Sequence, residues 1–182
     1  WQRPKKEVQL LLELFISSIE SEVKDLHENN IKLNFIGETD KFSEKLKKSM
    51  HDSELLTAAN SKLTLNIALN YSGRWDIHHA LLSIIDEVIS QKINVKEIDE
   101  ELINKKLSLA DYDEPDLLIR TGGEKRLSNY LLWQIAYTEL YFTDVLWPDF
   151  NPNQFNLALE WYAKRQRRFG KTSKQIEKNE NA

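Results

Sequence analysis

The sequence predicts an α/β fold, a single domain in which helices flank a mainly parallel central sheet. Two observations lead to this prediction. Apolar residues at helical spacing alternate along the chain with short runs at strand spacing, as in successive strand-helix units. The chain of 182 residues is also long enough for one domain with its own core, and no internal repeat or linker divides it.

The first predicted element is a helix that begins at Pro4, where the missing N–H of proline does no harm. Apolar residues recur at helical spacing from Val8 to Leu26. Leu10 and Leu14 widen this stripe, so the first half of the helix is apolar nearly all round. Such a helix is either buried on two sides, which is the commoner case, or forms the wall of an apolar cavity.

The rest of the chain alternates between strands and helices. The clearest strand is 62–71, with an apolar face from Leu63 to Tyr71 and a small, polar face opposite. The expected elements after the first helix are a strand at 32–36, a helix at 43–56, the strand at 62–71, helices at 75–91 and 97–107, a strand at 116–119, a helix at 129–136, a strand at 139–142 and a helix at 154–168. Residues 171–182 are polar and are expected to form a disordered tail.

Composition narrows the function before any motif is considered. The net charge of −4 argues against a general nucleic-acid binder, which would usually be basic. Cysteine is absent, so the chain has neither a disulfide nor a thiolate metal site, which fits a reducing compartment. No apolar run reaches the roughly 18 residues that span a bilayer, and no signal-peptide pattern is recognised. We therefore expect a cytoplasmic location.

The segment LIRTGGEKRLSN, residues 118–129, follows an expected strand. In open parallel sheets, ligands bind beyond the carboxyl ends of the strands. Arg120 and Arg126 bring permanent charge and forked donors that match phosphate oxygens. The segment matches neither the Walker pattern nor the dinucleotide-binding pattern. It predicts a phosphate or diphosphate pocket, and the alternative is a solvated basic loop.

Three further residues support the pocket. Gly122 and Gly123 let the backbone bend and come close to a ligand. Ser128 is placed to cap the helix expected after it, and the N-terminus of a helix attracts anions. The alternative is that Ser128 is an ordinary cap with no ligand.

Glu139 lies at the edge of an expected strand, eleven residues after Ser128. Mg²⁺ binds one or two protein carboxylates together with water and substrate phosphate oxygens, so Glu139 is a candidate metal ligand. The alternative is a salt bridge between Glu139 and one of the arginines, and the sequence alone favours this alternative.

Three segments resemble the cis-prenyltransferases, and among them the bacterial undecaprenyl diphosphate synthases. They are LNIALNYSGRWDI at 65–77, DLLIRTGGEKRLSNYLLWQIAYTELYFTDVLWPDF at 116–150 and RRFG at 167–170. The resemblance extends from Trp1 to Gly170. It implies an enzyme, a transferase that condenses isopentenyl diphosphate units onto farnesyl diphosphate with new cis double bonds. The product is a long polyprenyl diphosphate of the undecaprenyl type, and Mg²⁺ is the implied cofactor.

The resemblance also implies roles for individual residues. Arg120, Arg126 and Ser128 resemble the isopentenyl diphosphate site, with Leu127 contributing backbone, and Glu139 resembles the Mg²⁺ ligand. The apolar first helix and the apolar strand face would wall a tunnel for the growing chain.

Two terminal motifs match as well. Trp1 and Arg3, in the W-x-R-P element, resemble part of the allylic substrate site. Arg168 and Gly170 resemble an R-x-G element that reaches toward the active site of a partner subunit. The family is dimeric, so a homodimer with an interface around 129–150 is implied. Delivery of the product to a membrane is implied too, which adds the inner membrane face as a possible peripheral location.

The chain departs from the family pattern at its start. The family's H-x-x-x-M-D-G-N-x-R-W element is absent, so the catalytic aspartate is expected upstream of Trp1 and no catalytic residue within this segment. Residues 1–170 are therefore expected to be the C-terminal three quarters of the domain, without its first strands. The isolated segment is expected to show no turnover. Ser72 also replaces a glycine that is usual in N-Y-G-G-R.

Two rival functions remain open. One is a non-catalytic, prenyltransferase-like subunit that stabilises an active partner. Such subunits tend to lose the phosphate-binding arginines, whereas Arg120 and Arg126 are present here, so the enzyme is favoured. The other rival is an unrelated α/β nucleotide-binding domain, and the long match at 116–150 argues against it. The length of the product is not determined by the sequence.

Overall fold

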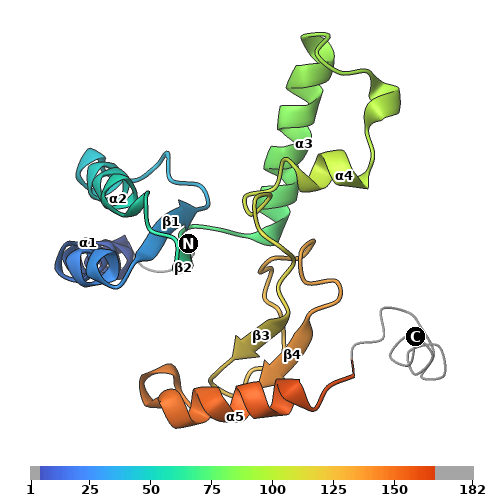
Figure 1. Ribbon diagram of the computed structural model, residues 1–182. Coiled ribbons are helices and arrows are strands. Elements are labelled where there is room, and N and C mark those ends of the chain that lie inside the picture. Colours follow the sequence, from blue (N-terminus) through green and yellow to red (C-terminus); the bar gives the residue numbers. More distant parts are fainter. Residues whose placement is uncertain (1–4, 167–182) are drawn as a thin grey trace. The chain divides into compact units, whose positions relative to one another are not determined.

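The computed structural model describes residues 5–166 and is shown in Figure 1. The chain divides into two compact units, with the boundary between Asp111 and Tyr112. Among the helices within residues 5–166, none is both long enough and apolar enough to cross a bilayer.

The first unit contains most of the predicted elements. They are α1 (Lys5–Glu28), β1 (Ile31–Ile36), α2 (Glu44–Thr57), β2 (Leu63–Ala68), α3 (Gly73–Ile89), a 3-10 turn η1 (Val95–Glu97) and α4 (Glu100–Asn104). The helix expected at 97–107 is shorter than predicted, because the 3-10 turn precedes it and α4 ends at Asn104.

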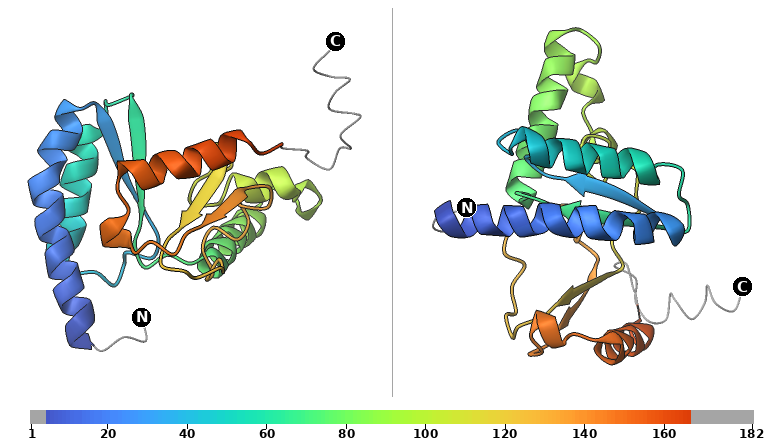
Figure 2. Two further views of the ribbon diagram at one scale, coloured as in Figure 1. Left: turned by 90° about the horizontal axis from the view of Figure 1, so that it is seen from below. Right: turned by 90° about the vertical axis from the view of Figure 1, so that its left-hand side faces the viewer.

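Strands β1 and β2 form a parallel pair in which Ile31 lies opposite Leu63 and Ile36 opposite Ala68. Helices α1 and α2 lie side by side on one face of this pair, as Figures 1 and 2 show. The core between them consists of buried apolar side chains from α1, α2 and the β1–α2 loop, namely Ile16, Ile19, Phe42, Leu46 and Met50. Burying each of these larger side chains contributes about 1.5–3 kcal/mol, so this cluster holds α1 and α2 on the strand pair.

The outer edge of β1 is closed by side chains of α2. The N–H of Leu33 donates to Oγ1 of Thr57 at 3.0 Å, and the N–H of Phe35 donates to Oε1 of Glu54 at 2.9 Å. These two donors point away from β2, and no strand within residues 5–166 pairs with this edge of β1. The pair is therefore asymmetric, with β1 covered along its free edge and Leu63 of β2 57% exposed.

A buried carboxylate fixes the start of α3. Asp76 is 2% exposed and accepts hydrogen bonds from the Tyr71 hydroxyl at 2.8 Å and from the N–H and hydroxyl of Ser108 at 2.9 and 2.7 Å. Ser72 caps the same helix by accepting from the N–H of Trp75 at 3.2 Å. Asp76 thus joins the β2–α3 turn to the segment that follows α4.

The second unit contains β3 (Leu117–Arg120), β4 (Glu139–Phe142), a 3-10 turn η2 (Trp147–Asp149) and α5 (Pro152–Ala163). Its two strands are parallel, with Leu117 opposite Glu139 and Arg120 opposite Phe142. Asn151 caps α5 through hydrogen bonds from the N–H groups of the first helical turn. The helix packs on β4 through Trp161, whose ring centroid lies 5.3 Å from that of Tyr141.

The helix predicted at 129–136 is wrong. Ser128, Asn129 and Leu131 have φ values of 50°, 63° and 44°, and the segment consists of turns. Successive left-handed residues interrupt a right-handed helix, which needs negative φ throughout. Ser128 therefore does not cap a helix, and the contribution of a helix N-terminus to the pocket is removed.

The predicted α/β class with parallel strands is confirmed. Within residues 5–166 the four strands are paired two by two, β1 with β2 and β3 with β4, and no described strand joins the two pairs into a continuous ladder. The tail predicted at 171–182 lies outside the described residues, and the assignment of 1–170 to one domain remains a prediction.

Candidate functional site

The loop after β3 is anchored at the carboxyl end of the strand pair. The N–H groups of Gly122 and Gly123 donate to the carbonyls of Val145 and Thr143 at 2.9 and 3.0 Å, and the N–H of Thr143 donates to the carbonyl of Arg120 at 2.9 Å. The two glycines have φ values of +81° and +77°, which other residues rarely adopt. The predicted bend is therefore present, at the strand ends where ligands are expected.

Arg120, the last residue of β3, folds the loop onto itself. Its Nη1 donates to the backbone carbonyl of Arg126 and, at 3.0 Å, to the hydroxyl of Ser128. The structure thus brings the side chains of Arg120 and Ser128 together, and it places the backbone of Arg126, but not its guanidinium, beside them. Ser128 contributes as a hydrogen-bond acceptor for Arg120, and not through a helix.

The guanidinium of Arg126 is paired with the carboxylate of Glu124. Both side chains are exposed, at 63% and 49%, so the pair contributes little to stability, about 0–1 kcal/mol. A diphosphate offers several charged acceptor oxygens and is a stronger partner for a forked guanidinium. Arg126 is thus held only by a weak, exposed ion pair, which an anion of higher charge could displace at little cost.

Glu139 is not brought into contact with either arginine of the loop. It is the first residue of β4 and lies opposite Leu117, three positions before the Arg120–Phe142 pair, which is about 10 Å along the strand. Its carboxylate accepts a hydrogen bond from Nε of Arg165 at 2.9 Å. Glu139 is therefore salt-bridged to an arginine, but to Arg165 after α5 and to neither arginine of the loop.

A single carboxylate fits Mg²⁺ as one contributing ligand. Mg²⁺ keeps several waters and is commonly held by one or two carboxylates and substrate phosphate oxygens. The side chain of Glu139 is 18% exposed, and its carboxylate is already paired with Arg165. No group of three or more acidic, histidine or cysteine side chains suited to a metal exists in the part of the chain that the structure describes.

Four predicted site residues fall outside the described range. Trp1 and Arg3 precede residue 5, and Arg168 and Gly170 follow residue 166. Leu127 is described and half-buried, and its carbonyl accepts from the N–H of Tyr130 at 3.3 Å.

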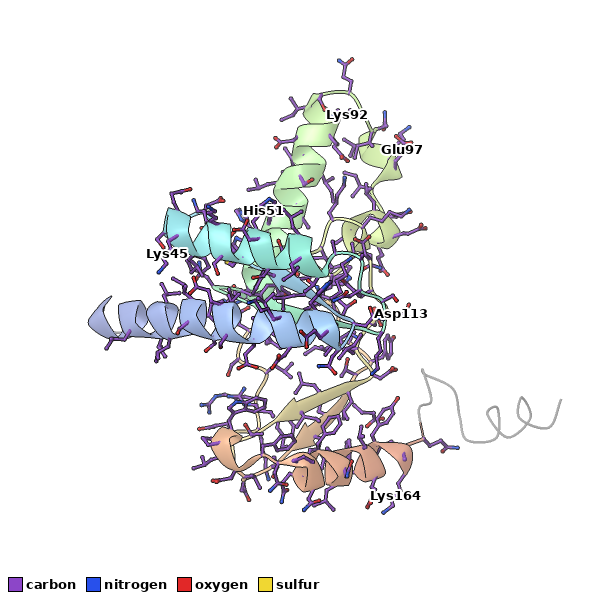
Figure 3. All side chains as sticks on the ribbon, turned by 60° about the vertical axis from the view of Figure 1, so that its left-hand side comes forward. Lys45, His51, Lys92, Glu97, Asp113 and Lys164 are labelled. Carbon is purple, nitrogen blue, oxygen red and sulfur yellow. The ribbon has the colours of Figure 1, made fainter. Side chains whose placement is uncertain are left out.

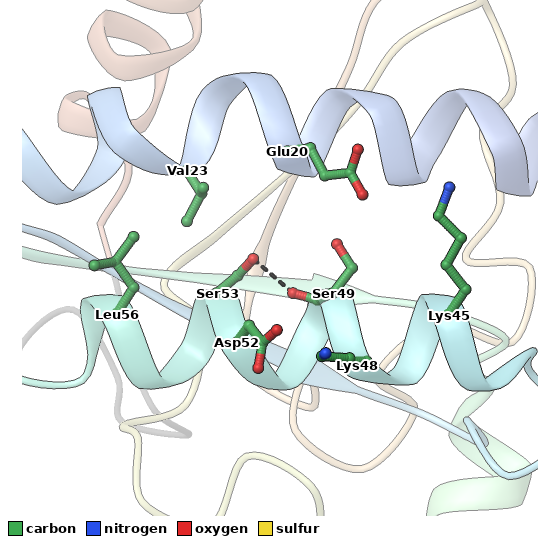
Figure 4. A pocket seen from close by; sticks show the side chains of 8 residues that line it. All are labelled: Glu20, Val23, Lys45, Lys48, Ser49, Asp52, Ser53 and Leu56. Carbon is green, nitrogen blue, oxygen red and sulfur yellow. Dashed lines mark hydrogen bonds between the residues drawn. The ribbon is translucent and has the colours of Figure 1, made fainter.

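Two cavities of the first unit are lined by none of the predicted site residues. A cavity of about 370 Å³ lies between α1 and α2, and Figure 4 shows side chains of both helices lining it, with Glu20 and Lys45 on opposite helices. Its lining is of mixed charge and carries no forked donor for a phosphate group. A second cavity, of about 700 Å³, runs along α3 past His79 and Asp86.

Two contacts of the site were missed by the sequence analysis. Glu124 pairs with Arg126 two residues away, a spacing that no helix or strand rule predicts in a loop. Arg165 reaches Glu139 and also lies 5.2 Å from the centroid of the Trp161 ring. Trp161 and Arg165 are four residues apart at the end of an expected helix, so their shared face could have been inferred.

Comparison with known proteins identifies the family of this chain. Residues 1–170 match the protein family described as "Putative undecaprenyl diphosphate synthase". The chain belongs to this family. The resemblance to cis-prenyltransferases is thereby confirmed.

Curated members of the undecaprenyl diphosphate synthase family are similar over most of the chain. The ditrans,polycis-undecaprenyl-diphosphate synthases ((2E,6E)-farnesyl-diphosphate specific) of Photorhabdus laumondii and Escherichia coli K12 are each 51% identical over 172 residues, which cover 94% of this chain and 68% of theirs. The enzyme of the same name from Aliivibrio fischeri is 49% identical over 177 residues, or 97% of this chain and 69% of its own.

Two solved structures have the same fold. Lavandulyl diphosphate synthase from Lavandula x intermedia, in complex with dimethylallyl diphosphate, has a TM-score of 0.90 and 36% identity, covering 93% of this chain and 74% of its own. A probable undecaprenyl diphosphate synthase from Campylobacter jejuni has a TM-score of 0.83 and 32% identity, with coverages of 94% and 78%.

Proposed function

We propose that the protein carrying this chain is a cis-prenyltransferase, a transferase that adds isopentenyl diphosphate units to farnesyl diphosphate and makes an undecaprenyl-type polyprenyl diphosphate. The observation that carries the proposal is the 51% identity to farnesyl-specific undecaprenyl diphosphate synthases over 94% of the chain. The clustering of Arg120, Arg126 and Ser128 at a strand end supports it.

In each cycle, the π electrons of isopentenyl diphosphate form a new C–C bond to the allylic carbon. The C–O bond of the allylic diphosphate breaks, inorganic diphosphate leaves, and a proton is lost from the isopentenyl unit. Such a reaction is accelerated mainly by positioning and by stabilisation of charge. The role of this loop is to hold one diphosphate, and with it the double bond, in a fixed place.

The loop contacts suggest how binding proceeds. Arg120 is oriented in advance by its bonds to the Arg126 carbonyl and to Ser128, so little side-chain freedom is lost when a ligand arrives. Arg126 exchanges the carboxylate of Glu124 for phosphate oxygens. Leu127 contributes backbone to the same pocket.

Glu139 is the proposed protein ligand for Mg²⁺, which when bound neutralises charge on the diphosphates. Its position at the start of β4, in the same strand pair as Arg120, supports this role. Trp1 and Arg3 are proposed to contact the allylic substrate.

The assembly is proposed to be a homodimer in which Arg168 and Gly170 reach the partner's active site. We place it in the cytoplasm or peripherally at the inner membrane face, where the product is delivered to the membrane. No nucleic-acid partner is proposed.

The test is an assay of the protein that carries this chain with farnesyl diphosphate and radiolabelled isopentenyl diphosphate. Product length is read by chromatography of the dephosphorylated lipid. A series that ends near the undecaprenyl length supports the proposal. Incorporation that is absent, although the protein is folded and Mg²⁺ is supplied, would overturn it.

A further inference from the structure

Arg165 is held by two separate contacts in the second unit. Its Nε donates to Oε2 of Glu139 at 2.9 Å, and its guanidinium carbon lies 5.2 Å from the centroid of the Trp161 ring. Trp161 in turn packs against Tyr141, with ring centroids 5.3 Å apart. The cation is therefore fixed by an aromatic surface as well as by the carboxylate.

The carboxylate of Glu139 is stabilised by a neighbouring positive charge. The side chain of Glu139 is 18% exposed at the beginning of β4, and its hydrogen bond and ion pair within residues 5–166 are both with Arg165. A carboxylate that is largely withdrawn from water is costly unless a positive charge accompanies it.

We propose that Arg165 is a built-in counter-ion for Glu139, which a divalent cation displaces from the carboxylate on binding. This inference rests on the proposed function, in which Glu139 is a metal ligand. A divalent ion carries twice the charge of a guanidinium, and it binds directly to the carboxylate oxygens. The contact of Arg165 with Trp161 does not use the carboxylate, so the guanidinium has a place to remain after displacement.

The exchange has a measurable consequence. Because metal and guanidinium compete for one carboxylate, removing the guanidinium should tighten metal binding. A purely structural role for Arg165 predicts the opposite, since a disordered Glu139 would bind metal more weakly. The sign of the change in affinity therefore separates the two roles.

The experiment measures Mn²⁺ affinity of the protein carrying this chain by electron paramagnetic resonance of the free ion. Arg165→Met should bind Mn²⁺ about two- to fivefold more tightly than the wild type, the range expected for loss of one partly exposed ion pair. Arg165→Lys keeps the charge and should lie between the two. The thermal midpoint of Arg165→Met should be lower without metal and should recover more than that of the wild type when Mn²⁺ is added.

Lys164→Met is the matched control. Lys164 is exposed at the end of α5, where Figure 3 labels it. Replacing it with methionine removes the same positive charge from the position next to Arg165. Its Mn²⁺ affinity should stay close to that of the wild type. If Arg165→Met binds Mn²⁺ no more tightly than Lys164→Met, the inference is overturned.

Glu139→Gln separates this inference from the proposed function. If Glu139→Gln binds Mn²⁺ as the wild type does, the proposed metal role of Glu139 fails. If Glu139→Gln loses Mn²⁺ while Arg165→Met and Lys164→Met behave alike, the metal role stands and only the counter-ion inference fails.

Discussion

Lys125 and Arg126 are adjacent, exposed cations in the loop after β3, and only Arg126 is assigned to the diphosphate. Replacing Arg126 with methionine removes a forked, charged donor, and such hydrogen bonds are worth about 1.5–3 kcal/mol. We expect Arg126→Met to raise KM for isopentenyl diphosphate by about ten- to a hundredfold. Steady-state kinetics with farnesyl diphosphate in excess measure the change.

Lys125→Met is the control for this prediction, because it removes the same charge from the same loop. Its KM should change by less than about threefold, as expected for a screened surface charge. Equal effects of the two substitutions would mean that the loop acts only through its net charge, and the assignment of Arg126 would be wrong.

Asp76 offers a second test for a single residue. It is buried and accepts three hydrogen bonds from Tyr71 and Ser108, so Asp76→Asn turns an acceptor into a donor at a site that needs acceptors. The free energy of unfolding should fall by about 1–3 kcal/mol. Urea denaturation measures the loss. Asp113→Asn, at an exposed position labelled in Figure 3, should change it by less than about 0.5 kcal/mol.

At the scale of elements, Thr57 of α2 accepts a hydrogen bond that closes the outer edge of β1. This side chain is fully buried, and Thr57→Val keeps its shape while removing the acceptor for the Leu33 N–H. A buried donor without a partner costs about 1–3 kcal/mol, so the unfolding free energy should fall by that amount. Hydrogen exchange at the Leu33 amide should also accelerate. The half-buried Thr64→Val on β2 is the control, and an equal loss there would remove the edge as the explanation.

The loop between β1 and α2 carries a pH-dependent contact. Hydrogen bonds from Lys41 and, more weakly, Asn70 lower the pKa of Glu38 below its ordinary value of 4.5. A carboxyl whose pKa is lower in the folded state stabilises the fold above pH 4.5, and this contribution disappears as the pH falls through the folded value. Glu38→Gln should therefore be less stable than the wild type at neutral pH and equal to it in acid. Denaturant midpoints across pH measure this, and a difference that persists in acid would contradict it.

At the scale of elements, the sequence predicts what depends on periodicity and misses what depends on isolated backbone choices. The strand at 139–142 has the predicted bounds. Its short apolar run is flanked by threonines, so both ends of the strand can be located from the sequence. The helix expected at 129–136 fails because Ser128 and Leu131 take left-handed conformations, which hydrophobic spacing does not detect. The salt-bridge partner of Glu139 could not be predicted from the sequence either, because several arginines follow it along the chain. The packing of Trp161 on β4 brings Arg165 to this carboxylate.

At the scale of the whole molecule, we expect proteases to cleave first at the boundary between the two units. It falls in an exposed, irregular stretch that contains Asp111 and Asp113, and such stretches are preferred sites of cleavage. Glu-C protease, under conditions in which it also cuts after aspartate, should cleave first after one of these residues. Pro115 should prevent cleavage after Glu114. First cuts inside α2 or α3 would show that the boundary is better protected than those helices.

The closed edge of β1 has a consequence for behaviour at high concentration. Exposed strand edges are templates on which copies of a chain add to one another and grow into fibrils. Because the outward amides of Leu33 and Phe35 are already engaged by a threonine and a glutamate, β1 offers an incoming copy neither of these donors. This flank of the molecule is therefore a poor template for self-polymerisation, and a change that frees those amides should appear as turbidity before any loss of folding.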